Sequence, residues 1–272
     1  MLCIIILISI LLTSCKKPRQ DQPNANPVIK EALDITSVLQ PVTHTITGNI
    51  GGYYIAIPSN YKQTHSSYPL LLFFHGAGQF GNGSLDLPLL LNDGPAQLLD
   101  EKRLPGVFKV HENDYSFIIL MPQTRSFAGN ADIAACIEFA RQTYRVDSSR
   151  IYLSGLSSGS EAICNFAATN TNNIAAIITM AGVPADYASA DKCKRIAEGN
   201  LPVWAFHSED DQTINVSYAK GFIASIASFH PTVMPKLTLW PTGGHDAWTR
   251  ALDPSFKSDG MNIYEWMLQY HR

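Results

Sequence analysis

The sequence lacks the cysteine pattern of a disulfide-rich or zinc-binding protein. It has five cysteines in 272 residues, and the three beyond residue 41 are Cys136, Cys164 and Cys193. They form no Cys-x-x-Cys pair and have no histidine at metal-ligand spacing. We therefore expect neither a disulfide framework nor a bound metal, although one bridge could form if the protein is exported.

A large excess of positive charge is also missing. The chain has 20 Lys and Arg against 23 Asp and Glu, which gives a net charge of −3. A protein that binds nucleic acid through its phosphates normally has a basic surface, so nucleic acid is not an expected partner. The apolar run at residues 2–12 is much shorter than the roughly 20 residues of a membrane-spanning helix, so it predicts an export signal instead.

This apolar run ends in Leu-Thr-Ser-Cys at residues 12–15, which resembles the lipobox of bacterial lipoproteins. The resemblance implies a signal peptide at residues 1–14 that is cut before Cys15, and a lipid on the Cys15 thiol. The alternative is an N-terminal helix in which Cys15 is free and buried. The two lysines that follow Cys15 favour the lipidated form.

Residues 15–41 predict a flexible tether. They are polar, contain four prolines, and have too few apolar residues to form a core. The basic residues at 16–19 would lie against anionic lipid head groups. Lys16 directly after Cys15 resembles a sorting signal for the outer membrane, so we expect the protein to be anchored there, in a bacterial cell envelope.

The remaining residues, 42–272, are enough for one domain with a single core. Consecutive apolar residues predict strands that are buried on both faces, as in a parallel sheet. Segments with helical apolar spacing alternate with them, which predicts an α/β fold. A glycine-containing turn between residues 43–47 and 53–57 predicts an antiparallel hairpin before the sheet. The other predicted strands are residues 70–74, 116–121, 150–153, 175–180, 202–206 and 236–240, and the predicted helices are residues 94–102, 131–145, 158–169, 216–228 and 262–270.

The pattern Gly-x-Ser-x-Gly at residues 155–159 follows one of these strands and precedes a helix. Glycines on both sides allow a tight turn, and a strand–turn–helix arrangement would expose the Ser157 hydroxyl above the sheet. The alternative is an ordinary Ser/Gly turn. The context favours Ser157 as a nucleophile.

A second small-residue loop, His75-Gly-Ala-Gly, follows the strand at residues 70–74. Its backbone could approach a reacting carbonyl, so the N–H groups of Ala77 and Ser158 are candidates for an oxyanion hole. Candidate substrate-binding side chains are His75, Gln79 and Trp248, although the imidazole of His75 is more simply explained as a brace for the loop.

Two further strand ends have acidic and histidine side chains. Glu209, Asp210 and Asp211 follow the strand at 202–206, and spacing alone does not choose among them. His245 lies in a glycine turn after the last strand. A Ser, acid, His order is that of a nucleophile, an orienting carboxylate and a general base.

Together these stretches resemble the α/β-hydrolases of the group that contains polyhydroxybutyrate-depolymerase-like, feruloyl and acetylxylan esterases and predicted peptidases. The resemblance is carried by residues 144–157, 201–214 and 244–248, and it spans about residues 52–266. It implies an α/β-hydrolase fold, a mostly parallel sheet with helices on both faces, and a triad of Ser157, Asp211 and His245 with Asp210 as the fallback acid. Ser208 stands where the group usually has Gly, and Gln79 and Phe80 stand where it often has Glu-Arg.

The resemblance implies a serine esterase that needs no cofactor or metal and removes acyl or feruloyl groups from carbohydrate or other small esters. One alternative is a serine peptidase of the same fold that acts on small peptides. Peptidases of this group usually have a large additional domain, for which this sequence leaves no room. A second alternative is a non-catalytic surface lipoprotein that binds a glycan.

The lipobox makes a prediction that can be tested in cells. Replacing Cys15 by Ser removes the thiol that would carry the lipid, so the protein should move from the membrane fraction to the soluble fraction after cell lysis. The measurement is immunodetection in both fractions, with Cys136→Ser as the matched control. If both variants stay with the membrane, Cys15 is not the anchor.

Overall fold

The computed structural model of the chain describes residues 37–183 and 190–272. The predicted signal peptide, Cys15 and residues 15–36 of the predicted tether lie outside the described residues. Within the described part, no helix combines the length and the apolar character needed to cross a membrane.

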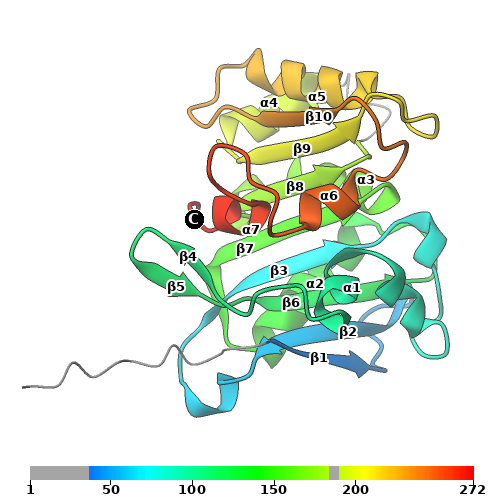
Figure 1. Ribbon diagram of the computed structural model, residues 1–272, viewed down its shortest axis with the longest axis vertical. Coiled ribbons are helices and arrows are strands. Elements are labelled where there is room, and N and C mark those ends of the chain that lie inside the picture. The colour runs from blue at the N-terminus through cyan, green and yellow to red at the C-terminus, as the bar shows by residue number, and fades with distance from the viewer. Residues whose placement is uncertain (1–36, 184–189) are drawn as a thin grey trace, which may run out of the picture. The chain divides into compact units, whose positions relative to one another are not determined.

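The apolar runs form the middle of an eight-stranded sheet (Figure 1). Six neighbouring strands run parallel to one another. The first two strands of the chain pair antiparallel with each other, and the second of them also pairs antiparallel with the outermost parallel strand. The predicted α/β class with a mostly parallel sheet is confirmed. In spatial order the strands are β1 (Ser37–Val42), β2 (Ile50–Pro58), β6 (Ile118–Thr124), β3 (Tyr68–Phe74), β7 (Val146–Leu156), β8 (Ala176–Met180), β9 (Val203–Ser208) and β10 (Lys236–Trp240).

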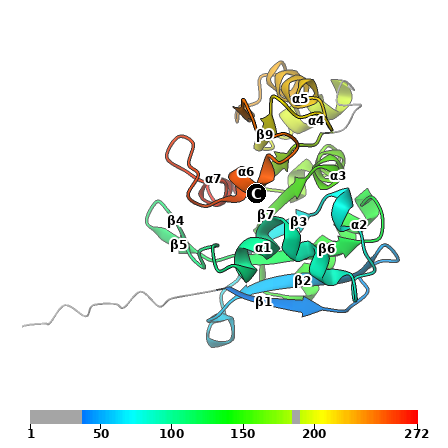
Figure 2. The same ribbon diagram turned by 45° about the vertical axis from the view of Figure 1, so that its right-hand side comes forward.

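Helices cover both faces of the sheet, as the ribbon in Figure 2 shows. Side chains alternate along each strand, so Leu70 and Leu72 of β3 pack in one core cluster while Leu71 and Phe73 pack in the other. Because both sets are buried, the central strands are continuously apolar. One face is covered by α2 (Asn130–Thr143), α3 (Ser158–Ala167), α4 (Ala190–Glu198) and α5 (Ser217–Ala227), and the other by α1 (Gly94–Asp100), α6 (Trp248–Leu252) and α7 (Ile263–Met267).

The predicted antiparallel N-terminal hairpin is confirmed, but its first strand lies earlier in the chain than predicted. Residues 43–47 are not a strand; β1 pairs with β2 from Ser37 opposite Pro58 to Val42 opposite Tyr53. Residues 37–41 therefore belong to the sheet and not to the tether. The strand was missed because an edge strand is half exposed and tolerates Pro41, so it has no continuous apolar run.

Two elements on the face covered by α1, α6 and α7 were not predicted. A short hairpin is made of β4 (Phe108–Val110) and β5 (Asn113–Tyr115), and its Phe108 ring stacks on Tyr264 of α7 with centroids 4.8 Å apart. Three-residue strands are too short to show a period of two. The short helix α6 directly follows the predicted histidine loop. It was missed because its 5 residues are too few to show a helical period.

The charged run at residues 191–195 lies in α4, whose Cys193 side is buried while Lys194 and Arg195 are exposed. Cys136, Cys164 and Cys193 are buried and form no disulfide. Burial raises the pKa of each of these thiols. Among residues 37–183 and 190–272, no group of three or more His, Cys, Asp or Glu side chains is arranged to hold a metal ion.

The order of the strands places the site. The connection after β3 leads to β6 on one side, while the connection after β7 leads to β8 on the other side. The crevice at such a change of direction lies outside the carboxyl ends of the strands and is the usual ligand site of a parallel sheet. Here that point is the carboxyl end of β3 and β7, where the loop after Phe74 lies beside the turn at Ser157.

The packing predicts that alanine substitutions at two leucines change the free energy of unfolding by very different amounts. Leu72 of β3 is fully buried, whereas Leu85 is 89% exposed. Leu72→Ala should lower the free energy of unfolding by about 2–5 kcal/mol because it leaves a cavity in the core. Leu85→Ala should change it by less than about 0.5 kcal/mol. Urea unfolding of both variants measures this, and equal losses would contradict the buried position of Leu72.

Candidate active site

Ser157 occupies a tight turn between a strand and a helix. β7 ends at Leu156 and α3 begins at Ser158, as predicted. The Ser157 backbone has φ 48° and ψ −120°, a conformation that costs a residue with a side chain about 1–3 kcal/mol. The turn places the Ser157 side chain at the carboxyl edge of the sheet.

The glycines of the motif are required by close packing of this turn. A Cβ atom on Gly155 would lie 2.6 Å from the carbonyl carbon of Gly159, and one on Gly159 would lie 2.1 Å from the carbonyl oxygen of Phe74. Both distances are far below van der Waals contact. Only glycine therefore lets β3, β7 and the start of α3 approach one another in this way.

Hydrogen bonds from β8 hold the turn. The N–H of Ser157 donates to the carbonyl of Met180 at 2.8 Å. The buried Ser160 hydroxyl donates to the carbonyl of Gly155 and accepts from the N–H of Met180 at 2.7 Å. These bonds link the strained residue to two central strands.

The predicted oxyanion loop lies beside Ser157. A Cβ atom on Gly76 would be 3.4 Å from the Cβ of Ser157. Ala77 and Ser158 are the first residues of a 3₁₀ turn and of α3, and the first N–H groups of a helix have no intrahelical acceptor. Neither N–H has a hydrogen-bond acceptor among the residues that the structure describes.

The His75 side chain is buried in this loop, with 4% of its surface exposed. The N–H of Thr124 donates to His75 Nε2 at 3.0 Å, so Nδ1 has the proton and donates to the carbonyl of Gly76 at 2.8 Å. Burial lowers the pKa of His75 and outweighs the opposite effect of the Gly76 bond. The neutral ring therefore supports the loop structurally, which is the role that the sequence analysis favoured for His75.

Gln79 is also buried, and its side-chain amide donates to the carbonyl of Leu89 at 3.0 Å. Fully buried Gln123 holds the same loop from β6: it accepts from the N–H of Gly83 at 2.9 Å and donates to the carbonyls of Gln79 and Asp86. His75 and Gln79 are therefore engaged within the loop instead of being presented to a ligand, which corrects the substrate-binding role considered for them.

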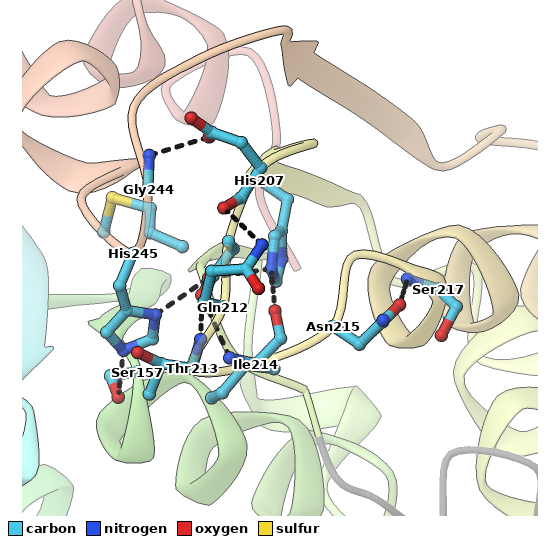
Figure 3. Close-up of polar contacts among 12 residues, drawn as sticks. Ser157, His207, Gln212, Thr213, Ile214, Asn215, Ser217, Gly244 and His245 are labelled. Atoms are coloured by element: carbon cyan, nitrogen blue, oxygen red, sulfur yellow. Dashed lines mark hydrogen bonds and ion pairs between the residues drawn. The ribbon is translucent and has the colours of Figure 1, made fainter.

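His245 lies between Ser157 and the turn that contains Thr213 and Ile214 (Figure 3). Its Nε2 is 3.0 Å from Ser157 Oγ, and its Nδ1 is 2.8 Å from Asp211 Oδ2. An ionised carboxylate only accepts hydrogen bonds, so Nδ1 has the proton and Nε2 is free to accept the proton of Ser157. The structure thus brings together the three side chains predicted from three different strand ends.

The Asp211 side chain is fully buried, and its carboxylate is held by its own turn. Its Oδ1 accepts from the N–H groups of Thr213 at 2.8 Å and Ile214 at 3.0 Å. Burial opposes ionisation, but the hydrogen bonds from His245, Ile214 and Thr213 outweigh it and hold the pKa of Asp211 below its ordinary value. The carboxylate is therefore charged at neutral pH.

The neighbouring acids have other contacts. Asp210 is exposed and accepts from the N–H of Gly244 at 2.8 Å, so it shapes the turn before His245. Asp246 accepts from the N–H of Thr249 at the start of α6. Glu209 pairs with Lys220 at 3.1 Å on the surface. Of these acids, Asp211 is the one in contact with His245.

A second histidine, His207, contacts the same carboxylate. It lies in the segment at residues 201–214 that carries the family resemblance, but the sequence analysis gave its side chain no role. Its Nε2 lies 3.1 Å from Asp211 Oδ2 and 2.9 Å from the carbonyl oxygen of Ile214. A histidine four residues before the acid, at the end of a buried strand, was the signal available in the sequence. Gln123 and Ser160 were also missed, because Gln123 bonds to the loop at residues 79–86 and Ser160 bonds to Met180, and these partners lie too far away along the chain for a pattern to show them.

Trp248 covers one side of His245. The two rings meet edge to face, with centroids 5.3 Å apart, and the indole N–H donates to Asp93 Oδ1 at 2.9 Å. Burial raises the pKa of Asp93; the nearby charge of Asp246 adds to this, and the Trp248 bond opposes it. Trp248 is therefore held in place beside the general-base position.

Aromatic side chains also lie beside the oxyanion loop. The Phe80 ring contacts the His75 ring at a centroid distance of 5.8 Å, and Phe127 contacts Phe80 at 5.3 Å. Phe127 is 67% exposed. An apolar surface thus extends outward from the loop that approaches Ser157.

The arrangement has the components needed to attack a carbonyl group. A hydroxyl beside a neutral imidazole can lose its proton as it attacks, and a buried carboxylate stabilises the imidazolium that forms. Two unpaired backbone N–H groups can receive the negative charge of a tetrahedral intermediate.

No protein-family model matches the sequence, and no curated protein matches it. Solved structures do match the fold. A thermostable esterase is 20% identical with a TM-score of 0.59, and the match covers 87% of this chain and 63% of that chain. A ferulic acid esterase from Anaeromyces mucronatus, solved with ferulic acid, is 15% identical with a TM-score of 0.57, covering 85% and 94%.

The third example is an acylaminoacyl peptidase from Pyrococcus horikoshii. It is 14% identical with a TM-score of 0.54, and the match covers 86% of this chain and 44% of that chain. The present chain thus spans less than two thirds of the thermostable esterase and less than half of the peptidase. At these identities the likeness concerns the fold, and it shows that the chain has the α/β-hydrolase fold.

Proposed function

We propose that the protein is a serine carboxylic-ester hydrolase. The observation that carries the proposal is the continuous line of contacts from Ser157 Oγ through both nitrogens of His245 to the Asp211 carboxylate. Ser157 lies on a strained strand-to-helix turn beside the N–H groups of Ala77 and Ser158, which have no acceptor within the described part of the chain. Each component of a nucleophilic acyl transfer is therefore within contact distance of the next.

In the first half of the reaction, His245 Nε2 removes the proton of Ser157 as Oγ forms a bond with the ester carbonyl carbon. The carbonyl oxygen becomes negative and accepts from the N–H groups of Ala77 and Ser158. The intermediate then collapses, the bond to the alcohol oxygen breaks, and His245 donates its proton to the leaving alcohol. The product is an acyl group on Ser157.

In the second half, His245 removes a proton from water as the water oxygen attacks the acyl carbon. The same two N–H groups receive the second oxyanion. Ser157 leaves with the proton from His245, and the carboxylic acid is released. Asp211 remains ionised throughout and stabilises the imidazolium in both halves.

For the substrate we propose acyl or feruloyl esters of carbohydrates or other small alcohols. The ferulic acid esterase from Anaeromyces mucronatus matches over 94% of its length, which supports this class. Trp248 is the candidate contact closest to His245, and the exposed Phe127 ring offers a second apolar surface. Aromatic rings of this kind pack well against an aromatic acyl group or a sugar face.

The peptidase alternative has less support. More than half of the acylaminoacyl peptidase from Pyrococcus horikoshii has no counterpart in this chain. A non-catalytic glycan-binding role would leave the contacts among Ser157, His245 and Asp211 without a function.

We further propose that Cys15 anchors the enzyme to the bacterial cell envelope, on the outer membrane, so that polysaccharide-linked esters are accessible substrates.

The first test is hydrolysis of chromogenic acetate and butyrate esters and of methyl ferulate by the full chain. Ser157→Ala removes the nucleophile and should lower kcat by about four to six orders of magnitude. The comparison among the three esters ranks the acyl groups.

Ser228→Ala, at an exposed position after α5, is the matched control and should retain the activity of the unaltered chain. Equal turnover by the unaltered chain and Ser157→Ala would contradict the proposal. Glycan binding would then be the next property to measure.

The second test concerns the acid. Asp211→Asn removes the charge that stabilises the imidazolium and should lower kcat by about 10⁴-fold. Asp210→Asn should cost much less, because an amide oxygen can still accept from Gly244. A larger loss for Asp210→Asn than for Asp211→Asn would reverse the assignment.

Asp211 also makes stability depend on pH. Its pKa is lower in the folded protein, so the ionised form stabilises the fold above the unfolded value of about 3.9, and this contribution is lost as the pH falls through the folded value. We expect the free energy of unfolding to fall more steeply below about pH 4 in the unaltered chain than in Asp211→Asn. Urea unfolding across this pH range measures the difference, and parallel curves would contradict it.

A further inference from the structure

His207 lies near the end of β9, and its side chain is fully buried beside the equally buried side chain of Asp211. Figure 3 shows the ring directed toward the turn that contains Thr213 and Ile214. His207 Nε2 is 2.9 Å from the carbonyl oxygen of Ile214 and 3.1 Å from Asp211 Oδ2. One ring nitrogen thus contacts two oxygens of the turn that supplies the acid.

The contacts determine where the proton of His207 lies. Both neighbours of Nε2 are acceptors, a carbonyl oxygen and a carboxylate oxygen, so Nε2 has the hydrogen. Nδ1 is buried and has no hydrogen-bond partner among residues 37–183 and 190–272. His207 therefore donates from Nε2.

The turn is bonded to β9 at its start, where the N–H of Asp211 donates to the carbonyl of Ser208 at 3.3 Å, and His207 contacts its far end at Ile214. Asp211 Oδ1 is held from within, by the N–H groups of Thr213 and Ile214. These bonds fix the carboxylate relative to the turn, but they do not fix the turn relative to the sheet. The His207 N–H donates to the carbonyl of Ile214, in the same turn, and its positive end lies beside Asp211 Oδ2, the oxygen that contacts His245.

We propose that His207 is a positioning residue for the acid: it fastens the 211–214 turn to β9 and so holds Asp211 Oδ2 at hydrogen-bond distance from His245. The proposal rests on the proposed serine-hydrolase function of this site. It goes beyond that function because it gives a role to a side chain that contacts neither the substrate nor the nucleophile. Two histidines then share one carboxylate oxygen, one as the general base and one as the support of the acid.

A pair of substitutions separates positioning from burial. His207→Gln places an amide nitrogen close to the position of Nε2, so the donor to Ile214 is retained. His207→Asn has the same amide group on a side chain that is one carbon shorter, so the donor does not reach Ile214. Both variants place an uncharged amide in the same buried volume, and they differ chiefly in reach.

The first measurement is the kinetics of the full chain on the esters used above, at a temperature where urea unfolding shows both variants to be folded. His207→Asn should lower kcat by about 10- to 100-fold, because a small displacement of a catalytic group has that effect, and KM should be nearly unchanged. His207→Gln should restore kcat to within a few-fold of the unaltered chain. His111→Asn, an exposed histidine in the β4–β5 turn, is the control.

The second measurement does not depend on turnover. The Nδ1–H proton of His245 lies in a charge-assisted hydrogen bond to Asp211, and such a proton resonates far downfield in the ¹H NMR spectrum. The resonance should be present in the unaltered chain and in His207→Gln, and it should shift or broaden in His207→Asn. If the unaltered chain hydrolyses none of the esters, the proposed function fails, and this resonance alone still decides the role of His207.

Two results would overturn the proposal. In one, His207→Asn leaves both kcat and the His245 resonance unchanged. In the other, the two variants lose kcat equally and in proportion to their loss of stability, which is the behaviour of a residue that only fills the core.

Discussion

The backbone of Ser157 is the constraint on which the site depends. A positive φ at a residue with a side chain is unfavourable by itself, so the surroundings must enforce it. They do so through glycine contacts too close for any side chain, through the hydrogen bond that the Ser157 N–H donates to the Met180 carbonyl, and through the bonds of the Ser160 hydroxyl to Gly155 and Met180. The same turn places the Ser158 N–H at the start of α3, so the geometry that exposes the hydroxyl also prepares one of the two oxyanion donors.

The acid side of the site is held as firmly as the nucleophile side. Asp211 is buried, charged and satisfied by hydrogen bonds from its own turn and from His245. A buried carboxylate without these partners would take up a proton and could no longer stabilise an imidazolium. The contact of His207 with this turn extends the support to β9, the neighbour of the edge strand β10.

Much of the fold was predictable from local patterns. Strands buried on both faces have continuous apolar runs, and five of them, β3, β6, β7, β8 and β9, were found near their observed positions, as was the half-buried edge strand β10. Short elements such as β4, β5 and α6, and the half-exposed edge strand β1, were missed because they show no period and no apolar run. At the site, Ser157 and His245 could be named because each follows a predicted strand. Spacing alone left Glu209, Asp210 and Asp211 open as the acid, and the family resemblance favoured Asp211.

The sequence by itself determined the fold class, the tight turn at Ser157 and the chemical groups at the strand ends, because these depend on residues that are close together along the chain. The tertiary structure decided which carboxylate meets His245, because Asp210 and Asp211 are adjacent in sequence but face different partners. It also decided that His75 and Gln79 are loop braces and that His207 contacts the acid. Such contacts join distant segments, so they follow from the packing of strands and loops and not from any local pattern.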